Sequence, residues 1–124
     1  MLLHHELLVI SEYDAATLVG CSEEDYAKAM QGRTAVSKGY DFAYKEIRYQ
    51  VKSNRPSGKD GSYVTKVNGP TNYDWDKLIW ILYDEAFRIQ EAWLWDVLDY
   101  KAQLGQLKRL SLTDLRKGKV LTIA

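Results

Sequence analysis

The chain has 124 residues, of which 46% are apolar, and this is enough for one domain with its own core. Lysine and arginine number 17, as do aspartate and glutamate, so the net charge is zero and argues against strong sequence-independent attraction to polyanions. Cys21 is the only cysteine, which excludes an intramolecular disulfide and a cysteine-rich zinc site and fits a reducing cytoplasm.

The sequence predicts a single soluble, cytoplasmic domain that covers residues 1–124. No apolar stretch approaches the length of a membrane span, and the first residues lack the pattern of a secretory signal. The four tryptophans and nine tyrosines are expected mainly to pack in the core or at its rim.

Two helices are predicted at the start of the chain. From Leu3 to Val19 apolar residues recur at helical spacing, and Glu12 shares one face with Leu8, Ala15 and Val19. Glu12 is therefore expected on the packed side. Gly20 predicts the end of this helix, and Ser22 with Asp25 three residues later resembles a capping box that opens a second helix.

A β-hairpin is predicted next, because residues alternate with a period of two in Tyr40–Tyr44 and again in Ile47–Lys52. A turn centred on Lys45 and Glu46 sets three cross-strand pairs: Tyr44 with Ile47, Phe42 with Tyr49, and Asp41 with Gln50. Lys52 then follows on the face that carries Asp41 and Gln50.

Residues 53–73 are rich in Gly, Pro, Ser and Asn and predict a long, mobile connection of the kind that often carries function. Three basic residues of this segment, Arg55, Lys59 and Lys66, could bind the phosphate backbone of a nucleic acid. The alternative is an ordinary solvated loop.

Further strands and helices are predicted in the second half. The apolar run Leu78–Tyr83 is typical of a central strand covered on both faces. Residues 87–95 predict a strand, followed by a helix that reaches Leu104; the alternative is that these residues already begin that helix. The strand is expected to carry four side chains on one face, namely Phe87, Ile89, Trp93 and Trp95. Ser111 and Asp114 predict a capping box for a last short helix, with Gly118 as the residue beyond its end.

The polar residues of the hairpin fit the chemistry of phosphodiester cleavage. This reaction needs an activated water and neutralisation of the charge that builds on the phosphate and the leaving oxygen, which Mg²⁺ held by carboxylates can supply. Mg²⁺ takes one or two carboxylates from a protein and fills its other positions with water and phosphate oxygens. Asp41, a helix carboxylate and an amide oxygen would suffice, with Lys52 beside them to orient the water or balance charge.

The segment GYDFAYKEIRYQVKSNRPSGK, residues 39–59, resembles the core motif of the PD-(D/E)XK nuclease superfamily, the restriction-endonuclease-like fold. Asp41 matches the strand-borne aspartate, and Gln50, Val51 and Lys52 match the (D/E/Q)-X-K tripeptide. The segment SEYDAATLVG, with Glu12, is similar to the helix that carries a further glutamate in many members. The stretch from Glu12 to WDKLIWILYD is also similar to small bacterial proteins of this superfamily.

The resemblance implies an α/β domain with a mixed sheet, N-terminal helices, the hairpin, further central strands and flanking helices. It also implies a Mg²⁺-dependent nuclease, with Mn²⁺ as a substitute, that acts on DNA. Asp41, Gln50 and Glu12 would be metal ligands, and Lys52 would assist the nucleophile. The sequence departs from the usual pattern at two places, since Gln50 carries no negative charge and Tyr40 stands where the motif has proline.

Because the chain has little room for a recognition domain, we expect a homodimer or an accessory protein partner. The candidate interface is the exposed part of Trp93–Tyr100, because Trp and Tyr are enriched in interfaces.

Three alternatives remain open. In a purely structural account, Asp41 and Gln50 form a cross-strand hydrogen bond, Lys52 neutralises them, and Glu12 pairs with Arg48. The chain could instead be a catalytically silent member of the same fold that binds nucleic acid or another protein as an accessory subunit. The third alternative is an unrelated α/β protein that matches the motif by accident.

Overall fold

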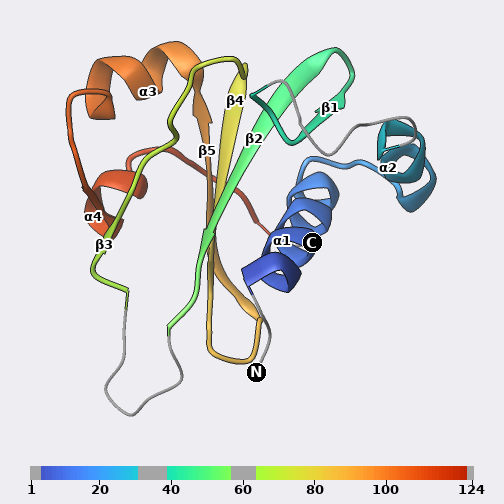
Figure 1. The fold of residues 1–124 in the computed structure, drawn as a ribbon, viewed down its shortest axis with the longest axis horizontal. Helices are drawn as coiled ribbons and strands as arrows, with labels where there is room; N and C mark the ends of the chain where they lie inside the picture. The colour runs from blue at the N-terminus through green and yellow to red at the C-terminus, as the bar shows by residue number, and fades with distance from the viewer. Residues whose placement is uncertain (1–3, 31–38, 57–63, 123–124) are drawn as a thin grey trace.

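The computed structural model describes residues 4–30, 39–56 and 64–122, with side chains from residue 9 onward. One mixed sheet separates two layers: α1 and α2 lie on one side, and α3, α4 and β3 lie on the other (Figure 1). This confirms the expected combination of a mixed sheet with helices. In chain order the elements are α1 (His4–Leu18), α2 (Glu23–Met30), β1 (Phe42–Tyr44), β2 (Ile47–Asn54), β3 (Lys66–Val67), β4 (Lys77–Tyr83), β5 (Ile89–Asp96), α3 (Val97–Leu104), β6 (Leu110–Ser111), α4 (Leu112–Leu115) and β7 (Lys119–Val120).

The main sheet has five strands in the order β1-β2-β4-β5-β7. β2 and β4 run parallel, and the other neighbours are antiparallel. A parallel pair needs a connection that returns along the sheet, and here the connection carries β3, which pairs with β6 in a separate antiparallel ribbon. The predicted central strand is confirmed, because β4 lies between β2 and β5 and its residues Leu78 to Ile81 are at most 1% exposed.

Both N-terminal helices form as predicted. α1 ends with Gly20 at φ +87°, where the Cys21 N–H donates to the Ala16 carbonyl at 2.9 Å. Glycine adopts this left-handed conformation without the steric cost of a Cβ, which explains the predicted stop. The Ser22 hydroxyl accepts the Asp25 N–H at 3.1 Å and caps α2. Within the described ranges, no helix is long and apolar enough to cross a membrane.

Each face of the sheet has its own apolar core. On the α1 side, Ala15 and Ala16 let the helix approach strands that present larger side chains such as Phe42 and Ile79. On the α3 side, the core is built from aromatic residues. All four tryptophans belong to this second core and are at most 2% exposed, which confirms the expectation that they pack inside: Trp75, Trp80, Trp93 and Trp95.

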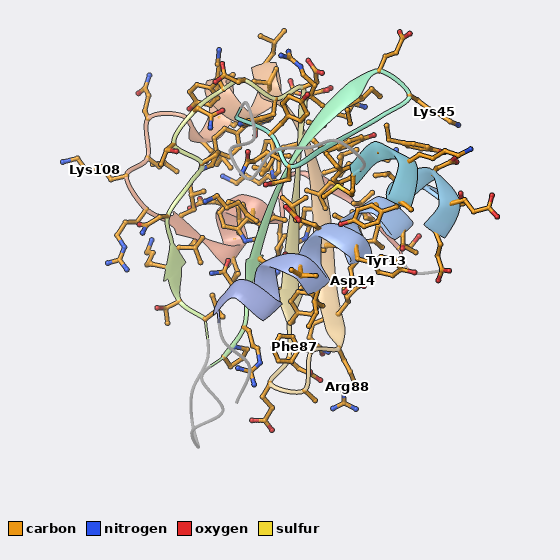
Figure 2. The ribbon with its side chains drawn as sticks, turned by 45° about the vertical axis from the view of Figure 1, so that its right-hand side comes forward. Tyr13, Asp14, Lys45, Phe87, Arg88 and Lys108 are labelled. Carbon is orange, nitrogen blue, oxygen red and sulfur yellow. The ribbon has the colours of Figure 1, made fainter. Side chains whose placement is uncertain are left out.

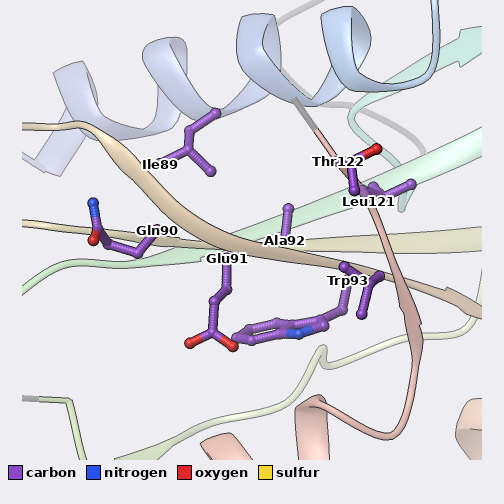
Figure 3. A pocket seen from close by; sticks show the side chains of 8 residues that line it. Ile89, Gln90, Glu91, Ala92, Trp93, Leu121 and Thr122 are labelled. Carbon is purple, nitrogen blue, oxygen red and sulfur yellow. The ribbon is translucent and has the colours of Figure 1, made fainter. Parts of the chain in front are cut away.

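The prediction that four side chains of this strand share one face of the sheet is wrong, because β5 contains a bulge. Leu82 pairs with Glu91 whereas Tyr83 pairs with Ile89, so Gln90 is an extra residue in β5. Because of this insertion, Ile89 and Ala92 point toward α1, and Glu91 and Trp93 point to the other side (Figure 3). The four residues Phe87, Ile89, Trp93 and Trp95 therefore do not share one face, and Phe87 lies in the preceding turn with φ 62°.

The C-terminal helix is confirmed together with its capping box, in which Ser111 and Asp114 bond each other's backbone N–H. The role predicted for Gly118 is wrong, because the helix ends at Leu115, three residues earlier. Gly118 lies against the ring of Trp95, and a Cβ at this position would stand 2.5 Å from Trp95 Nε1. Close packing requires glycine here.

The predicted interface region does not offer the aromatic side chains on which the prediction rested. Trp93, Trp95 and Tyr100 are 1%, 2% and 3% exposed, so they fill the core of the chain itself. The large exposed side chain of the region is Leu98, at 74%. Association with a second copy or with another protein stays a prediction without this argument.

Candidate functional site

Two of the three predicted cross-strand pairs of the hairpin are formed, and the third, Asp41 with Gln50, lies beyond the end of β1. Phe42 pairs with Tyr49 and Tyr44 with Ile47. Lys45 and Glu46 form the two-residue turn with φ values of 51° and 67°. Positive φ at both central residues is the feature of the hairpin turn whose twist matches the flanking strands, although Asn-Gly is the usual sequence. The turn therefore fixes which residues of β2 lie beside Asp41.

Asp41 lies immediately before β1 and is bound to β2 through both backbone and side chain. Its N–H donates to the Tyr49 carbonyl at 2.7 Å, and its Oδ2 accepts the Val51 N–H at 2.6 Å. The Asp41 carboxylate thus accepts a backbone N–H of β2, as a main-chain carbonyl of the neighbouring strand would do in a β-sheet. It is held beside the backbone of the QVK tripeptide, whose outer members are Gln50 and Lys52.

Gln50 and Lys52 share the face of β2 that looks toward the α3 side. Their partners on β4 are Leu78 and Trp80, which both belong to the aromatic core of that side. Both side chains are half-buried. Among the described residues, neither the Gln50 amide nor the Lys52 ammonium forms a hydrogen bond or an ion pair.

Asn54 extends this polar row by one step, and the sequence reasoning missed it. Its Oδ1 accepts the Trp80 Nε1–H at 2.6 Å and so joins the row to the aromatic core. The signal was available, because Asn54 continues the alternation of Gln50 and Lys52 by one more period.

Glu12 is not brought to this face. α1 packs on the side of the sheet that carries Tyr49 and Val51, and strand alternation sends Gln50 and Lys52 to the opposite side. The sheet therefore stands between the helix of Glu12 and these two side chains. Asp14 of α1 does reach the sheet: its Oδ2 accepts the hydroxyl of buried Tyr83 at 2.6 Å (Figure 2 shows Asp14 on α1).

Two contacts of the purely structural account are not seen. The Asp41 carboxylate binds the backbone of Val51, in place of the expected bond to the Gln50 amide. Arg48 pairs with Asp76 rather than with Glu12: its guanidinium and its backbone N–H both donate to that carboxylate. Hydrogen bonds from the Arg48 side chain, followed by the bond from its backbone, hold the pKa of Asp76 below its usual value.

The three basic residues predicted to contact phosphate have different outcomes. The Arg55 guanidinium donates to the Glu85 carbonyl at 2.6 Å and lies 4.4 Å from the centre of the Phe87 ring, so it is engaged with the β4–β5 turn. Lys59 lies outside the described residues. Lys66 is exposed on β3.

Two cavities lined by described residues lie away from Asp41, Gln50 and Lys52. A pocket of about 340 Å³ sits beside β5 and β7, and its single ionisable side chain, Glu91, is paired with Arg116 (Figure 3). A second cavity, of about 330 Å³, lies between α3 and the start of β7. Within the described ranges, no group of three or more His, Cys, Asp or Glu side chains could hold a metal ion. At the hairpin, the residues predicted as ligands bring together one carboxylate, from Asp41, and one neutral amide oxygen, from Gln50.

No protein-family model matches the sequence, and no curated protein matches it significantly. Function is therefore inferred from the geometry of the residues.

Proposed function

We propose that the chain is a metal-dependent nuclease with a restriction-endonuclease-like core that hydrolyses phosphodiester bonds in DNA. The observation that carries the proposal is the carboxylate of Asp41, fixed at 2.6 Å on the N–H of Val51. Val51 separates Gln50 from Lys52 in the chain, and both of these polar side chains are half-buried. Gln50 and Lys52 have no hydrogen-bond or ion-pair partner among the described residues, so both side chains can contact a ligand.

The donor set fits a hard divalent cation in part. Asp41 supplies one carboxylate, and Gln50 supplies an amide oxygen, both of which are ligand types of Mg²⁺. The Val51 N–H holds the carboxylate in place and takes one of its roughly four lone-pair sites. A bound Mg²⁺ would activate water and neutralise charge on the phosphate.

Lys52 lies next to Gln50 on the same face of β2 and completes the proposed site. Since no carboxylate of the described residues forms an ion pair with it, its ammonium can act on a substrate group. A lysine in this place orients the attacking water or stabilises the negative charge of the transition state.

The experiment that tests the proposal is cleavage of supercoiled plasmid and single-stranded DNA with Mg²⁺ or Mn²⁺. Wild type should cut only with metal, and Asp41→Asn and Lys52→Gln should each lower the rate by about 100-fold or more. Lys28→Gln, a change on exposed α2, serves as the matched control and should cut normally. Absence of cutting by the folded wild type, or full activity in Asp41→Asn, would overturn the proposal.

A second candidate is a catalytically silent protein of the same fold that binds nucleic acid as an accessory subunit. One observation favours it: the helix of Glu12 lies on the other side of the sheet, so the proposed site has a single carboxylate from the residues predicted for it. This candidate predicts DNA binding by the wild type that does not change with Asp41→Asn, and no cleavage under any metal condition.

A further inference from the structure

The chain segments that supply the helices on the two sides of the sheet carry opposite charge. Residues 4–30, which form α1 and α2, hold six acidic side chains and one lysine. Residues 97–122, which include α3, β6, α4 and β7, hold six basic side chains and two acidic ones. The acidic layer, residues 4–30, thus carries a charge of −5, the basic layer, residues 97–122, carries +4, and the other residues contribute +1. Of these two layers, the basic one has the local positive charge that a polyanion requires.

The basic layer contains a ribbon whose geometry suits a phosphate backbone. In the β3–β6 ribbon, Lys66 pairs with Ser111 and Val67 pairs with Leu110. Val67 and Leu110 are 5% and 0% exposed, so they form the inner face of the ribbon. Arg109 is exposed, directly precedes β6 and stands two residues before Ser111; continued strand alternation would make it the diagonal neighbour of Lys66. Such diagonal neighbours stand about 7–8 Å apart, which is close to the spacing of successive phosphates on one strand.

The cations of this ribbon are not neutralised by ion pairs. Among the described residues, Lys66, Lys108 and Arg109 form no salt bridge. The acid that faces Lys66 is Asp114, whose pKa is lowered first by the Ser111 backbone N–H and to a smaller extent by nearby lysines. Asp114 is committed to the capping box of α4, so it does not close an ion pair with the ribbon.

Two further features extend the basic surface. Lys108 projects outward on the side away from Asp14 and Lys45 (Figure 2). On α3, the Lys101 ammonium lies 4.6 Å from the centre of the Tyr73 ring, which is 40% exposed. An exposed aromatic ring beside free cations is a combination that nucleic-acid-binding surfaces use for stacking and for phosphate contact.

We infer that the outer face of the β3–β6 ribbon, with Lys66, Lys108 and Arg109, binds the phosphodiester backbone of the nucleic acid. This inference rests on the proposed function, and it deepens it by naming the surface that holds the substrate. The ribbon lies on the α3 side of the sheet, which is also the side that Gln50 and Lys52 face. Nucleic acid bound there approaches the proposed site from the basic layer, and the acidic layer of α1 and α2 repels it from the other side.

The test measures binding of a fluorescent DNA duplex of arbitrary sequence. Fluorescence anisotropy reports the binding constant at each of a series of salt concentrations. The Lys66→Gln/Arg109→Gln double variant should bind more weakly, and the slope of log K against log salt should fall by about 2, since each phosphate contact contributes about 0.9. The matched control is Lys28→Gln/Lys45→Gln, which removes the same charge from two exposed positions on the α1 and β1 side. The control should keep both the affinity and the slope of the wild type.

Three outcomes would overturn the inference: an unchanged slope in the ribbon variant, an equal loss in the control, or no binding of the duplex by the wild type at low salt. Failure of the proposed function is distinguishable from these. If the wild type binds DNA through the ribbon but never cuts it, the inferred binding surface is supported and the nuclease proposal is refuted. If the wild type cuts DNA while the ribbon variant binds it normally, the nuclease proposal is supported and the inferred binding surface is refuted.

Discussion

Replacing Asp41 by asparagine separates the structural contact of this residue from its proposed chemistry. The Oδ2 atom accepts the Val51 N–H at 2.6 Å, and Val51 itself is buried. Alanine removes the acceptor and leaves a backbone donor unpaired, whereas asparagine keeps an oxygen of the same shape and removes the negative charge.

The magnitudes follow from the kind of bond. Hydrogen bonds to charged groups contribute about 1.5–3 kcal/mol, and the lower end applies to Asp41 because its side chain is half-buried. We therefore expect Asp41→Ala to lower the free energy of unfolding by about 1.5 kcal/mol and Asp41→Asn by about 0.5–1 kcal/mol. Urea unfolding at neutral pH measures both, with the slope m unchanged if the transition remains two-state. Cleavage is then compared under conditions where all three proteins are folded.

The reasoning predicts that both variants lose cleavage although asparagine retains most of the stability. If Asp41→Asn cut DNA at the wild-type rate, the negative charge at this position would have no part in the chemistry. If Asp41→Ala unfolded at the same urea concentration as the wild type, the bond to Val51 would not contribute to stability.

Further predictions concern packing and hydrogen bonding in the core and the ionisation of a buried tyrosine. Gly118→Ala should cost about 1–3 kcal/mol by overpacking against Trp95, measured by urea unfolding; a neutral effect would contradict the close contact. Tyr83→Phe should cost about 1.5–3 kcal/mol by removing the bond to Asp14, and a double-mutant cycle with Asp14→Ala that shows no coupling would refute this. Burial raises the pKa of Tyr100 to about 12, whereas an unfolded tyrosine ionises near 10. Ionisation thus favours the unfolded chain first, and stability should fall by up to about 1.4 kcal/mol per pH unit from pH 10 to 12. Tyr100→Phe should flatten this fall, and an unchanged alkaline profile in the variant would contradict it.

Local features of the fold could be predicted from the sequence because their causes are local. The Lys45-Glu46 turn follows from the alternation on either side of it, and the register of the hairpin then follows from the turn. The caps at Ser22 and Ser111 depend on residues three positions apart. Gly20 likewise needs only its own backbone conformation to end α1.

The facing of the elements could not be predicted, because it depends on contacts between distant segments. The bulge at Gln90 has no marker in the sequence, and it exchanges the faces on which Ile89 and Trp93 lie. The position of Glu12 was inferred from helical periodicity, which gives the packed side of the helix but not the face of the sheet on which the helix packs. Both errors concern the same question, namely which side chains share one face of the sheet.

The basic ribbon could not be predicted from sequence motifs either, although its basic residues are visible in the sequence. Lys66 and Arg109 are 43 positions apart, and only the pairing of β3 with β6 brings them together. A count of charge along the chain would have separated the acidic first segment from the basic last one. It would not have placed these segments on opposite sides of a sheet.

The single carboxylate of the proposed site has a consequence for how metal and nucleic acid bind. One carboxylate with one amide holds Mg²⁺ more weakly than two carboxylates do, and phosphate oxygens are further ligands of the type that Mg²⁺ prefers. Metal affinity should therefore depend on bound nucleic acid, and by thermodynamic linkage DNA affinity should rise by the same factor when Mg²⁺ is added. The Lys52→Gln variant allows this to be measured by anisotropy, because it retains Asp41 and is expected to cut about 100-fold or more slowly than the wild type. Adding Asp41→Asn should abolish the rise but keep the salt dependence that Lys66 and Arg109 set. If DNA affinity were equal with and without Mg²⁺ in a protein whose wild type cuts DNA, the metal would be held without help from the substrate, and ligands other than Asp41 and Gln50 would be required.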